Sequence, residues 1–350
     1  MLMSRDLASR SSIWFSRPTE IEFSFNNLCN LKCIMCGKAD NEPNMKMEKS
    51  LGVRFLDEIL PCALHLTPSA NSEPFLNDMD LIYDLCMKHN LTLFLFTNGV
   101  LCTEEKFRKI QARVHRLWFS FDSHVKETYE QIRVGAQFET VVKNMRRTVE
   151  LAAEDDTEIT FHFVLMQLNL LQLPDYVRFV AGLGGTQLKV QELLPNSHNY
   201  SALKVESRFS DKQILDVLDK AIEAANEEKV DLVYCLRPPF ANETKNLPIR
   251  TRSKDPMASL RELYMEATQK IFPQFCNMAA NYLKITPAGD VFPCCRAPSV
   301  LKMGNIADSS FEAIWNGQPY KRFREKMFNQ DYDDVCRSCS VLTGNPYFIP

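Results

Sequence analysis

Hydrophobic residues recur with two different periods between residues 19 and 235. A period of two is typical of β-strands, and the segment 20–25 shows it, with Ile21 and Phe23 alternating with Glu22 and Ser24. The same alternation, bounded by turn residues, predicts strands over 20–25, 63–67, 91–96, 116–121, 158–166, 187–193 and 230–235.

Between these strands, hydrophobic residues recur every three or four positions, the period of an amphipathic helix. The clearest case is 138–153, where Val141, Met145 and Val149 share one face. Helices are predicted over 50–60, 77–89, 103–113, 138–153, 172–182, 211–228 and 258–272. Strands that alternate with helices predict βα units around a parallel sheet, so the expected fold class is α/β.

The pattern changes after residue 235. The segment 236–257 contains several prolines and many charges, which is typical of a linker, and the end of the chain is rich in cysteines and turns. The chain is therefore predicted to have four parts, namely an N-terminal extension (1–18), an α/β domain (19–235), a linker with a helix (236–272) and a small Cys-rich domain (273–350).

Three cysteines, Cys29, Cys33 and Cys36, follow the first predicted strand within one short loop. Three thiolates can hold three irons of a cubane cluster and leave the fourth iron open to a cosubstrate. A zinc knuckle is the alternative, but a structural zinc site closes with four ligands, and this region offers no nearby fourth cysteine.

The Cys-x3-Cys-x2-Cys spacing after a first strand resembles the radical S-adenosylmethionine (radical SAM) enzymes. The resemblance covers about residues 18–340 and implies a partial (β/α)6 TIM-like barrel with the site at the C-terminal ends of its strands. In that family the open iron chelates S-adenosylmethionine (SAM), and reduction by a flavodoxin- or ferredoxin-type protein yields a 5′-deoxyadenosyl radical. The radical then takes a hydrogen atom from the substrate.

Other strand ends also resemble the family. The segment Asn71–Pro74 stands where the family has Gly-Gly-Glu-Pro, and Thr97-Asn98-Gly99 is a family-like turn, although both also suit ordinary structural turns. Arg133 has the alternative of a plain surface position. The residues that the resemblance assigns to SAM are Ser72, Glu73, Ser120, Asp122, Arg133, Met166 and Asn169.

A second cysteine set lies at the C-terminus, around a predicted hairpin over 282–292. Its members are Cys276, Cys294, Cys336 and Cys339. The set resembles the SPASM and twitch domains of the same superfamily, and four thiolates imply one auxiliary 4Fe–4S cluster ligated by protein alone. Four thiolates also suit zinc, which stays the alternative here. Cys295 is a bystander or an alternate ligand.

Alternation also predicts which residues face the inside of the barrel. If Ser120 and Asp122 face inward, so does Trp118, and the matching phase on other strands adds further polar residues. The resulting substrate candidates are Glu22, Ser24, His65, Trp118 and His162. Polar residues in such a position predict a polar substrate, while a satisfied structural role is the alternative for each histidine.

Cys235 ends the last predicted strand, near the expected mouth of the barrel. A buried free cysteine is usually a small hydrophobic residue. The functional alternative is a hydrogen-atom donor that quenches a substrate radical.

Composition and charge limit the expected partners and the expected cellular compartment. A formal net charge of −3 with interspersed charges argues against nucleic-acid binding. No apolar run reaches membrane-spanning length, and the N-terminus is polar, so a cytoplasmic protein with no membrane contact is expected. Twelve cysteines without a signal peptide favour metal ligation in a reducing compartment over disulfides.

The expected function is hydrogen abstraction from a polar substrate, with oxidation or epimerisation of a small sugar-like or natural-product metabolite as the outcome. A maturase that epimerises or crosslinks a ribosomally made peptide is the first alternative. The short segment before Thr19, which has no room for a peptide-recognition domain, favours the small molecule. Two readings from other classes are a zinc-stabilised binding protein and a passive iron–sulfur electron carrier. Anaerobic purification separates the enzyme from the zinc protein, because the enzyme should be brown with roughly eight irons and the zinc protein colourless. The electron carrier should hold clusters but neither bind nor cleave SAM.

Overall fold

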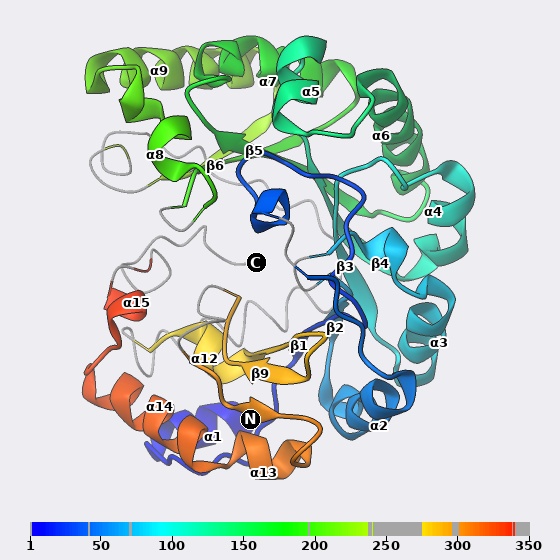
Figure 1. Cartoon of the computed structure of the whole chain (residues 1–350), viewed down its shortest axis with the longest axis vertical. Coiled ribbons are helices and arrows are strands. Elements are labelled where there is room, and N and C mark those ends of the chain that lie inside the picture. The colour runs from blue at the N-terminus through cyan, green and yellow to red at the C-terminus, as the bar shows by residue number, and fades with distance from the viewer. Residues whose placement is uncertain are drawn as a thin grey trace. The chain divides into compact units, whose positions relative to one another are not determined.

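The computed structural model covers all 350 residues (Figure 1), and it describes residues 2–40, 43–69, 72–194, 197–236, 240, 275–295, 301–337 and 339. The predicted helix over 258–272 and most of the predicted linker lie outside the described residues. The chain divides into two compact units. The first unit comprises Met1–Leu28, Asn44–Phe94 and Ser253–Pro350, and the second comprises Cys29–Pro43 and Leu95–Arg252.

The sheet of the first unit joins the start of the chain to its end. β1 (Glu20–Phe23) pairs in parallel with β2 (His65–Thr67) on one side and with β8 (Tyr282–Ile285) on the other. β2 pairs in parallel with the first residues of β3 (Thr92–Thr97). β9 (Asp290–Phe292) runs antiparallel to β8 and to β10 (Gly304–Asn305). The predicted C-terminal hairpin is thus confirmed.

Two helices, α2 and α3, lie along one side of β2 (Figure 1). Gly52 of α2 allows a close approach to β1, because a Cβ there would lie 2.6 Å from the Phe25 ring. Among its described residues, the helices of this unit are α1 (Leu2–Ala8), α2 (Lys49–Ile59), α3 (Met79–His89), α12 (Asn277–Asn281), α13 (Phe311–Trp315), α14 (Gln318–Asn329) and α15 (Asp334–Arg337), with single 3-10 turns at Leu60–Cys62 and Pro74–Leu76.

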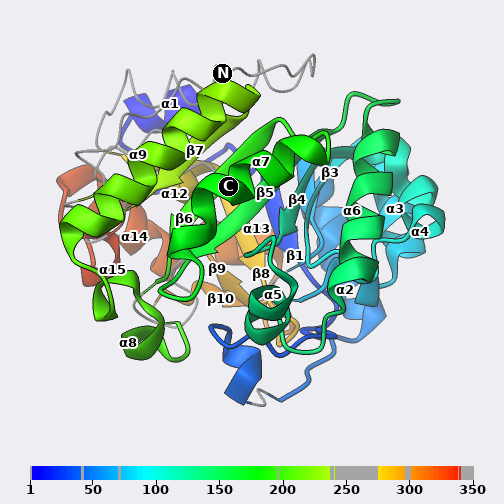
Figure 2. The ribbon, with the colours of Figure 1, turned by 90° about the horizontal axis from the view of Figure 1, so that it is seen from above.

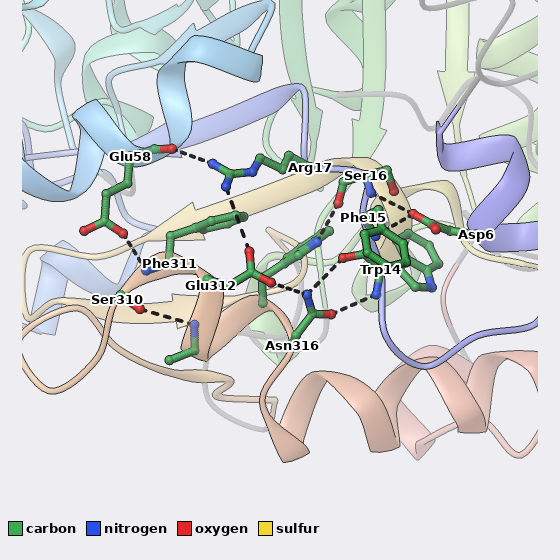
Figure 3. A network of polar contacts seen from close by, with 12 residues as sticks. Asp6, Trp14, Phe15, Ser16, Arg17, Glu58, Ser310, Phe311, Glu312 and Asn316 are labelled. Atoms are coloured by element: carbon green, nitrogen blue, oxygen red, sulfur yellow. Dashed lines mark hydrogen bonds and ion pairs between the residues drawn. The ribbon is translucent and has the colours of Figure 1, made fainter.

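The N-terminal segment is fastened to the C-terminal helices of the same unit (Figure 3). The Asn316 side chain accepts a hydrogen bond from Trp14 N at 2.8 Å and donates one to Trp14 O at 2.9 Å. Trp315 Nε1 donates to Ser16 O at 2.7 Å. The Asp6 carboxylate accepts from the amide of Ser16 at 2.7 Å. Residues 1–18 therefore form part of the packed unit.

The second unit contains four parallel strands in chain order. β4 (Val114–Ser120), β5 (Glu158–Leu165), β6 (Gln187–Glu192) and β7 (Asp231–Cys235) pair with one another in that sequence. Their helices include α6, α7 and α9, which lie along one side of the strands (Figure 2). The helices are α4 (Glu104–Ile110), α5 (Lys126–Ile132), α6 (Phe138–Ala152), α7 (Leu173–Gly182), α8 (Tyr200–Leu203) and α9 (Asp211–Glu228), with 3-10 turns at Gly37–Asp40, Gln111–Arg113, Leu170–Gln172 and Val205–Ser207.

The predicted strands, and the predicted helices up to residue 228, are confirmed with ends shifted by at most three residues. Six of the described helices were not predicted, namely α1, α5, α8, α12, α14 and α15. α1 and α5 each span two turns at most, too short for a hydrophobic period to stand out. Among the described residues, no helix is long and apolar enough to cross a membrane.

Candidate functional site

The loop with the first three cysteines belongs to the second unit and is held by backbone hydrogen bonds. Lys32 N donates to Val134 O at 2.9 Å, and Ile34 N donates to Ile132 O at 3.0 Å. The loop therefore runs beside the segment that ends α5. Within this loop the Cys33 thiol is buried, that of Cys36 is exposed, and that of Cys29 is partly exposed.

The Thr97-Asn98-Gly99 turn supports the same loop. Asn98 Nδ2 donates to Asn30 Oδ1 at 2.9 Å and lies 3.8 Å from the Cys29 sulfur. Gly99 N donates to Thr97 Oγ1 at 3.1 Å, and Gly99 has a φ of 79°, a conformation that favours glycine. In this structure the turn fixes the cysteine loop, which favours the structural interpretation of the motif.

A buried ion pair lies against the central cysteine. Arg133 Nη1 is 3.6 Å from the Cys33 sulfur, and Arg133 Nε donates to Asp122 Oδ2 at 2.5 Å. Burial raises the pKa of the Cys33 thiol, whereas the Arg133 charge acts to lower it. Burial alone would lower the pKa of Arg133, but Asp122 and Cys33 raise it, so the guanidinium stays charged. A fixed cation beside a thiol favours the thiolate, the form that binds iron.

Asp122 is in turn fixed by the end of the fifth strand. Its Oδ1 accepts from Val164 N at 2.8 Å, and its backbone carbonyl accepts from Asn169 Nδ2 at 2.9 Å. Asn169 Oδ1 accepts from Met166 N at 2.8 Å. The structure therefore brings together four residues predicted to contact SAM, and Asp122 and Asn169 are fully buried. Their contact with SAM stays a prediction.

Polar side chains share one face of the second unit's strands, as alternation predicts. Ser120 pairs with His162, and His162 pairs with Lys189. The Trp118 and His162 rings stack with centroids 5.7 Å apart, and Lys189 Nζ lies 4.2 Å from the Trp118 centroid. Burial, together with the nearby charges of Lys189 and Arg133, lowers the pKa of His162 to about 3.

Lys189 was not among the predicted site residues. The signal was present, since the period-two alternation of 187–193 puts Lys189 on the face of its register partner His162. Cys235 lies on the same face, because it pairs with Gln191, whose side chain is 3.4 Å from His162 Nε2. The thiol is buried, and 4% of the residue is exposed.

In the first unit, Ser24 is fully buried and holds the loop that carries Glu73. Its hydroxyl is 3.0 Å from Ser72 Oγ and donates to Asn77 Oδ1 at 3.1 Å. Glu73 N donates to Leu28 O at 2.8 Å. Ser24 and Ser72 are thus brought together, and Ser24 has a structural role beside its predicted contact with substrate.

Another buried ion pair crosses from β1 to β8. Lys284 Nζ is 2.9 Å from Glu22 Oε1, and the Tyr282 hydroxyl donates to the same carboxylate. His65, whose register partner is Glu20, contacts Thr92 Oγ1 through Nδ1 at 2.7 Å. Glu22 and His65 therefore lie on the same face of their sheet, as alternation predicts.

The four C-terminal cysteines influence one another electrostatically within the first unit. The pKa of Cys276 is raised to about 12, mainly by burial and further by Cys339 and Cys336, while the amides of Ala279 and Met278 act to lower it. The pKa of Cys336 is also raised to about 12, by burial and then by Cys294 and Cys339. The chemistry of these residues fits an auxiliary cluster, because four thiols interact electrostatically with one another and Cys276 accepts hydrogen bonds from backbone amides.

Neither thiol set is converged in this structure. Among the described residues, no group of three or more His, Cys, Asp or Glu side chains is arranged to hold a metal ion. The identity of the ligands therefore stays a prediction.

Comparison with known proteins finds a family model and several curated relatives. Residues 276–340 match the SPASM family model, described as an iron–sulfur cluster-binding domain. A probable GTP 3′,8-cyclase of Methanococcus maripaludis is 26% identical over 53% of this chain, and the match spans 63% of that relative. A cofactor-modifying protein of tungsten-containing aldehyde ferredoxin oxidoreductase, from Pyrococcus furiosus, is 23% identical over 89% of this chain and 85% of its own.

Solved structures share the fold. SuiB of Streptococcus suis, bound to S-adenosylmethionine, has a TM-score of 0.65 and 15% identity over 95% of this chain and 73% of its own. AnSMEcpe with bound AdoMet has a TM-score of 0.60 and 17% identity over 92% of this chain and 87% of its own. The predicted fold class, a partial (β/α)6 barrel with a small C-terminal Cys-rich domain, is confirmed.

Proposed function

We propose that this chain is a radical SAM enzyme with a C-terminal SPASM domain, and that it removes a hydrogen atom from a carbon of a polar substrate. Its cofactors are SAM, the 4Fe–4S cluster that binds SAM, and an auxiliary iron–sulfur cluster. Together, SAM and its cluster supply a 5′-deoxyadenosyl radical when a flavodoxin- or ferredoxin-type protein provides the electron. Cys29, Cys33 and Cys36 hold that cluster, and the four C-terminal cysteines hold the other.

The chain's own residues prepare the site before any chemistry. Arg133 keeps a positive charge beside Cys33, and Asp122 keeps that arginine in place. Ser72 and Glu73 provide polar groups for the amino acid part of SAM, and Ser24 fixes their loop. Met166 and Asn169 shape the end of β5, where the adenine is expected.

The polar face of β4, β5 and β6 is the observation that carries the substrate class. Trp118, His162 and Lys189 combine an aromatic surface, a neutral imidazole and an ammonium group in one cluster. Such a combination suits a hydroxylated or charged substrate, because buried polar groups need polar partners. We assign a small sugar-like or natural-product metabolite to this face.

Oxidation and epimerisation differ in what happens to the substrate radical. In an alcohol oxidation, the carbon loses a hydrogen atom to the adenosyl radical, the hydroxyl proton goes to solvent, and the remaining electron goes to the auxiliary cluster. In an epimerisation, a thiol returns a hydrogen atom on the opposite side, and Cys235 is the candidate because it lies on the polar face.

A Cys235→Ala variant separates the two outcomes. For an epimerase, the variant should still cleave SAM and abstract hydrogen but yield little product of inverted configuration, because the hydrogen donor is missing. Cys86→Ala, which removes another buried thiol, serves as the control and should keep full product yield. Normal yield and stereochemistry from Cys235→Ala would return this residue to a packing role and favour oxidation.

A second candidate substrate is a ribosomally made peptide. It is favoured by two of the structural neighbours, since SuiB has been solved bound to the precursor peptide SuiA and anSMEcpe with the Cp18Cys peptide. The polar face would then receive one side chain of the peptide.

The deciding experiment follows deuterium. Reconstituted enzyme is incubated with fractionated extract from cells grown in deuterated medium, and 5′-deoxyadenosine is analysed by mass spectrometry. Transfer of deuterium from a low-mass fraction supports the small metabolite, and transfer from a peptide fraction supports the maturase. SAM cleavage without transfer from any fraction would contradict hydrogen abstraction from substrate, and a colourless, zinc-bound protein would contradict the enzyme.

A further inference from the structure

Lys284 is an unusual residue for the interior of a sheet. It lies in the middle of β8 and is 1% exposed. Removing a lysine ammonium from water costs several kcal/mol unless an opposite charge and hydrogen bonds compensate for it. Packing alone therefore does not explain why a lysine occupies this buried position.

The compensation comes from β1. Glu22 is the register partner of Lys284, and its Oε1 lies 2.9 Å from Lys284 Nζ, while the Tyr282 hydroxyl occupies the other carboxylate oxygen. Replacement of a buried ion pair by apolar residues is often neutral or stabilising. Stability alone therefore does not account for this charge.

The hairpin also brings Lys284 close to the auxiliary cysteines. Lys284 pairs with Phe292 across β8 and β9, and Cys294 follows Phe292 by two residues in the bend that leaves β9. Lys284 interacts electrostatically with both Cys295 and Cys294. Although burial acts to lower the pKa of Lys284, Glu22 and these thiols raise it above the usual value, so the ammonium stays charged.

We propose that Lys284 raises the reduction potential of the auxiliary cluster, and that Glu22 and Tyr282 hold its ammonium beside the Cys294 side of that cluster. This inference rests on the proposed function, in which Cys276, Cys294, Cys336 and Cys339 hold the cluster. Reduction adds one negative charge, and a fixed positive charge in a low-dielectric interior stabilises the reduced form. A higher potential makes the cluster a better acceptor for the electron that a substrate radical gives up during oxidation.

The test measures the potential of the auxiliary cluster alone. Cys29, Cys33 and Cys36 are changed to Ala in every variant, so that a single cluster titrates in an EPR-monitored redox titration. In this background, Lys284→Met should lower the midpoint potential by an amount that corresponds to at least a tenfold loss in the reduction equilibrium, or 59 mV for one electron.

The matched control is Lys302→Met. Lys302 follows the same hairpin and pairs with Asp290 at 2.5 Å, but its side chain is 53% exposed. Solvent screens an exposed charge, so this variant should keep the wild-type potential. A shift of equal size in both variants would mean that net charge, rather than the position of Lys284, sets the potential, and would overturn the proposal.

A second variant guards against a folding defect, because Lys284→Met leaves the Glu22 carboxylate buried without its cation. The double variant Glu22→Gln/Lys284→Met removes both charges and should still show a lowered potential. An unchanged potential in a folded variant with its cluster intact would overturn the role of Lys284 and leave the proposed function standing. Failure of the Cys-to-Ala background to assemble any cluster would overturn both.

Discussion

At the scale of single residues, a buried cation lies next to sulfur in each unit. Arg133 lies against Cys33 in the second unit, and Lys284 interacts with Cys294 in the first. Each cation is held by a carboxylate, Asp122 or Glu22, on a neighbouring segment. Cations fixed in this way favour thiolates in the protein before iron is bound.

Asp122→Asn tests the pair in the second unit. The substitution leaves the Arg133 guanidinium buried without its counter-charge, so the free energy of unfolding should fall by about 3–5 kcal/mol. Urea denaturation measures the change. Asp175→Asn, which breaks an exposed pair with Arg178, should cost less than about 1 kcal/mol. Equal effects of the two substitutions would contradict the role of Asp122 as the buried counter-charge of Arg133.

His162 predicts a dependence of stability on pH. Its pKa is about 3 in the folded protein, below the ordinary 6.5, so the unfolded chain binds a proton first as the pH falls. As the pH falls from 6.5 to about 5, this difference should lower the free energy of unfolding by about 2 kcal/mol. His162→Gln should flatten this part of the stability profile. Parallel profiles of wild type and variant would show that His162 titrates normally.

At the scale of elements, short helices and turns position the sulfur atoms. Cys276 precedes α12, and Cys336 lies in α15. Cys339 follows Cys336 by three residues, and its backbone N donates a hydrogen bond to Cys336 O at 3.0 Å. α12 and α15 are only five and four residues long. Helices of that length have little stability of their own, so they depend on what binds at their ends.

Replacement of Cys336 and Cys339 by Ser should therefore affect folding as well as iron. We expect the variant to lose about four irons per chain and to become less soluble, because metal binding and folding are coupled in small metal domains. Iron analysis and the soluble fraction after expression give the result. Cys62→Ser, at an exposed cysteine outside both sets, should change neither. Full iron content and solubility in the double variant would exclude these two ligands.

At the scale of the whole molecule, the two cysteine sets belong to different compact units. Each set should therefore take up iron without the other. Replacement of Cys29, Cys33 and Cys36 by Ala should abolish SAM cleavage while about four irons remain, since four thiolates suffice for one cubane. Iron content and 5′-deoxyadenosine formation check this expectation. Cleavage at the wild-type rate would rule out the assignment of these three residues.

The sequence predicted local structure and spacing well and long-range partners poorly. Alternation was enough to put Trp118, Ser120 and His162 on one face. It could not reveal that β8 pairs with β1, because period two does not identify a strand's neighbour far along the chain. Lys284 was missed for that reason, since a lysine in a hairpin suggests a solvent-facing position until its partner Glu22 is known.

The hydrogen bonds between Trp14 and Asn316 have a consequence for the order in which the two units fold during synthesis. The N-terminal segment leaves the ribosome long before the helices that bind it are synthesised. β1 likewise emerges long before its partner strand β8. The second unit does not depend on later residues, because all of it lies before residue 253. The nascent chain should therefore complete its second unit first and expose Trp14 to chaperones until the last residues emerge. Arrested chains that end before residue 310 would show this as protease cleavage near Trp14.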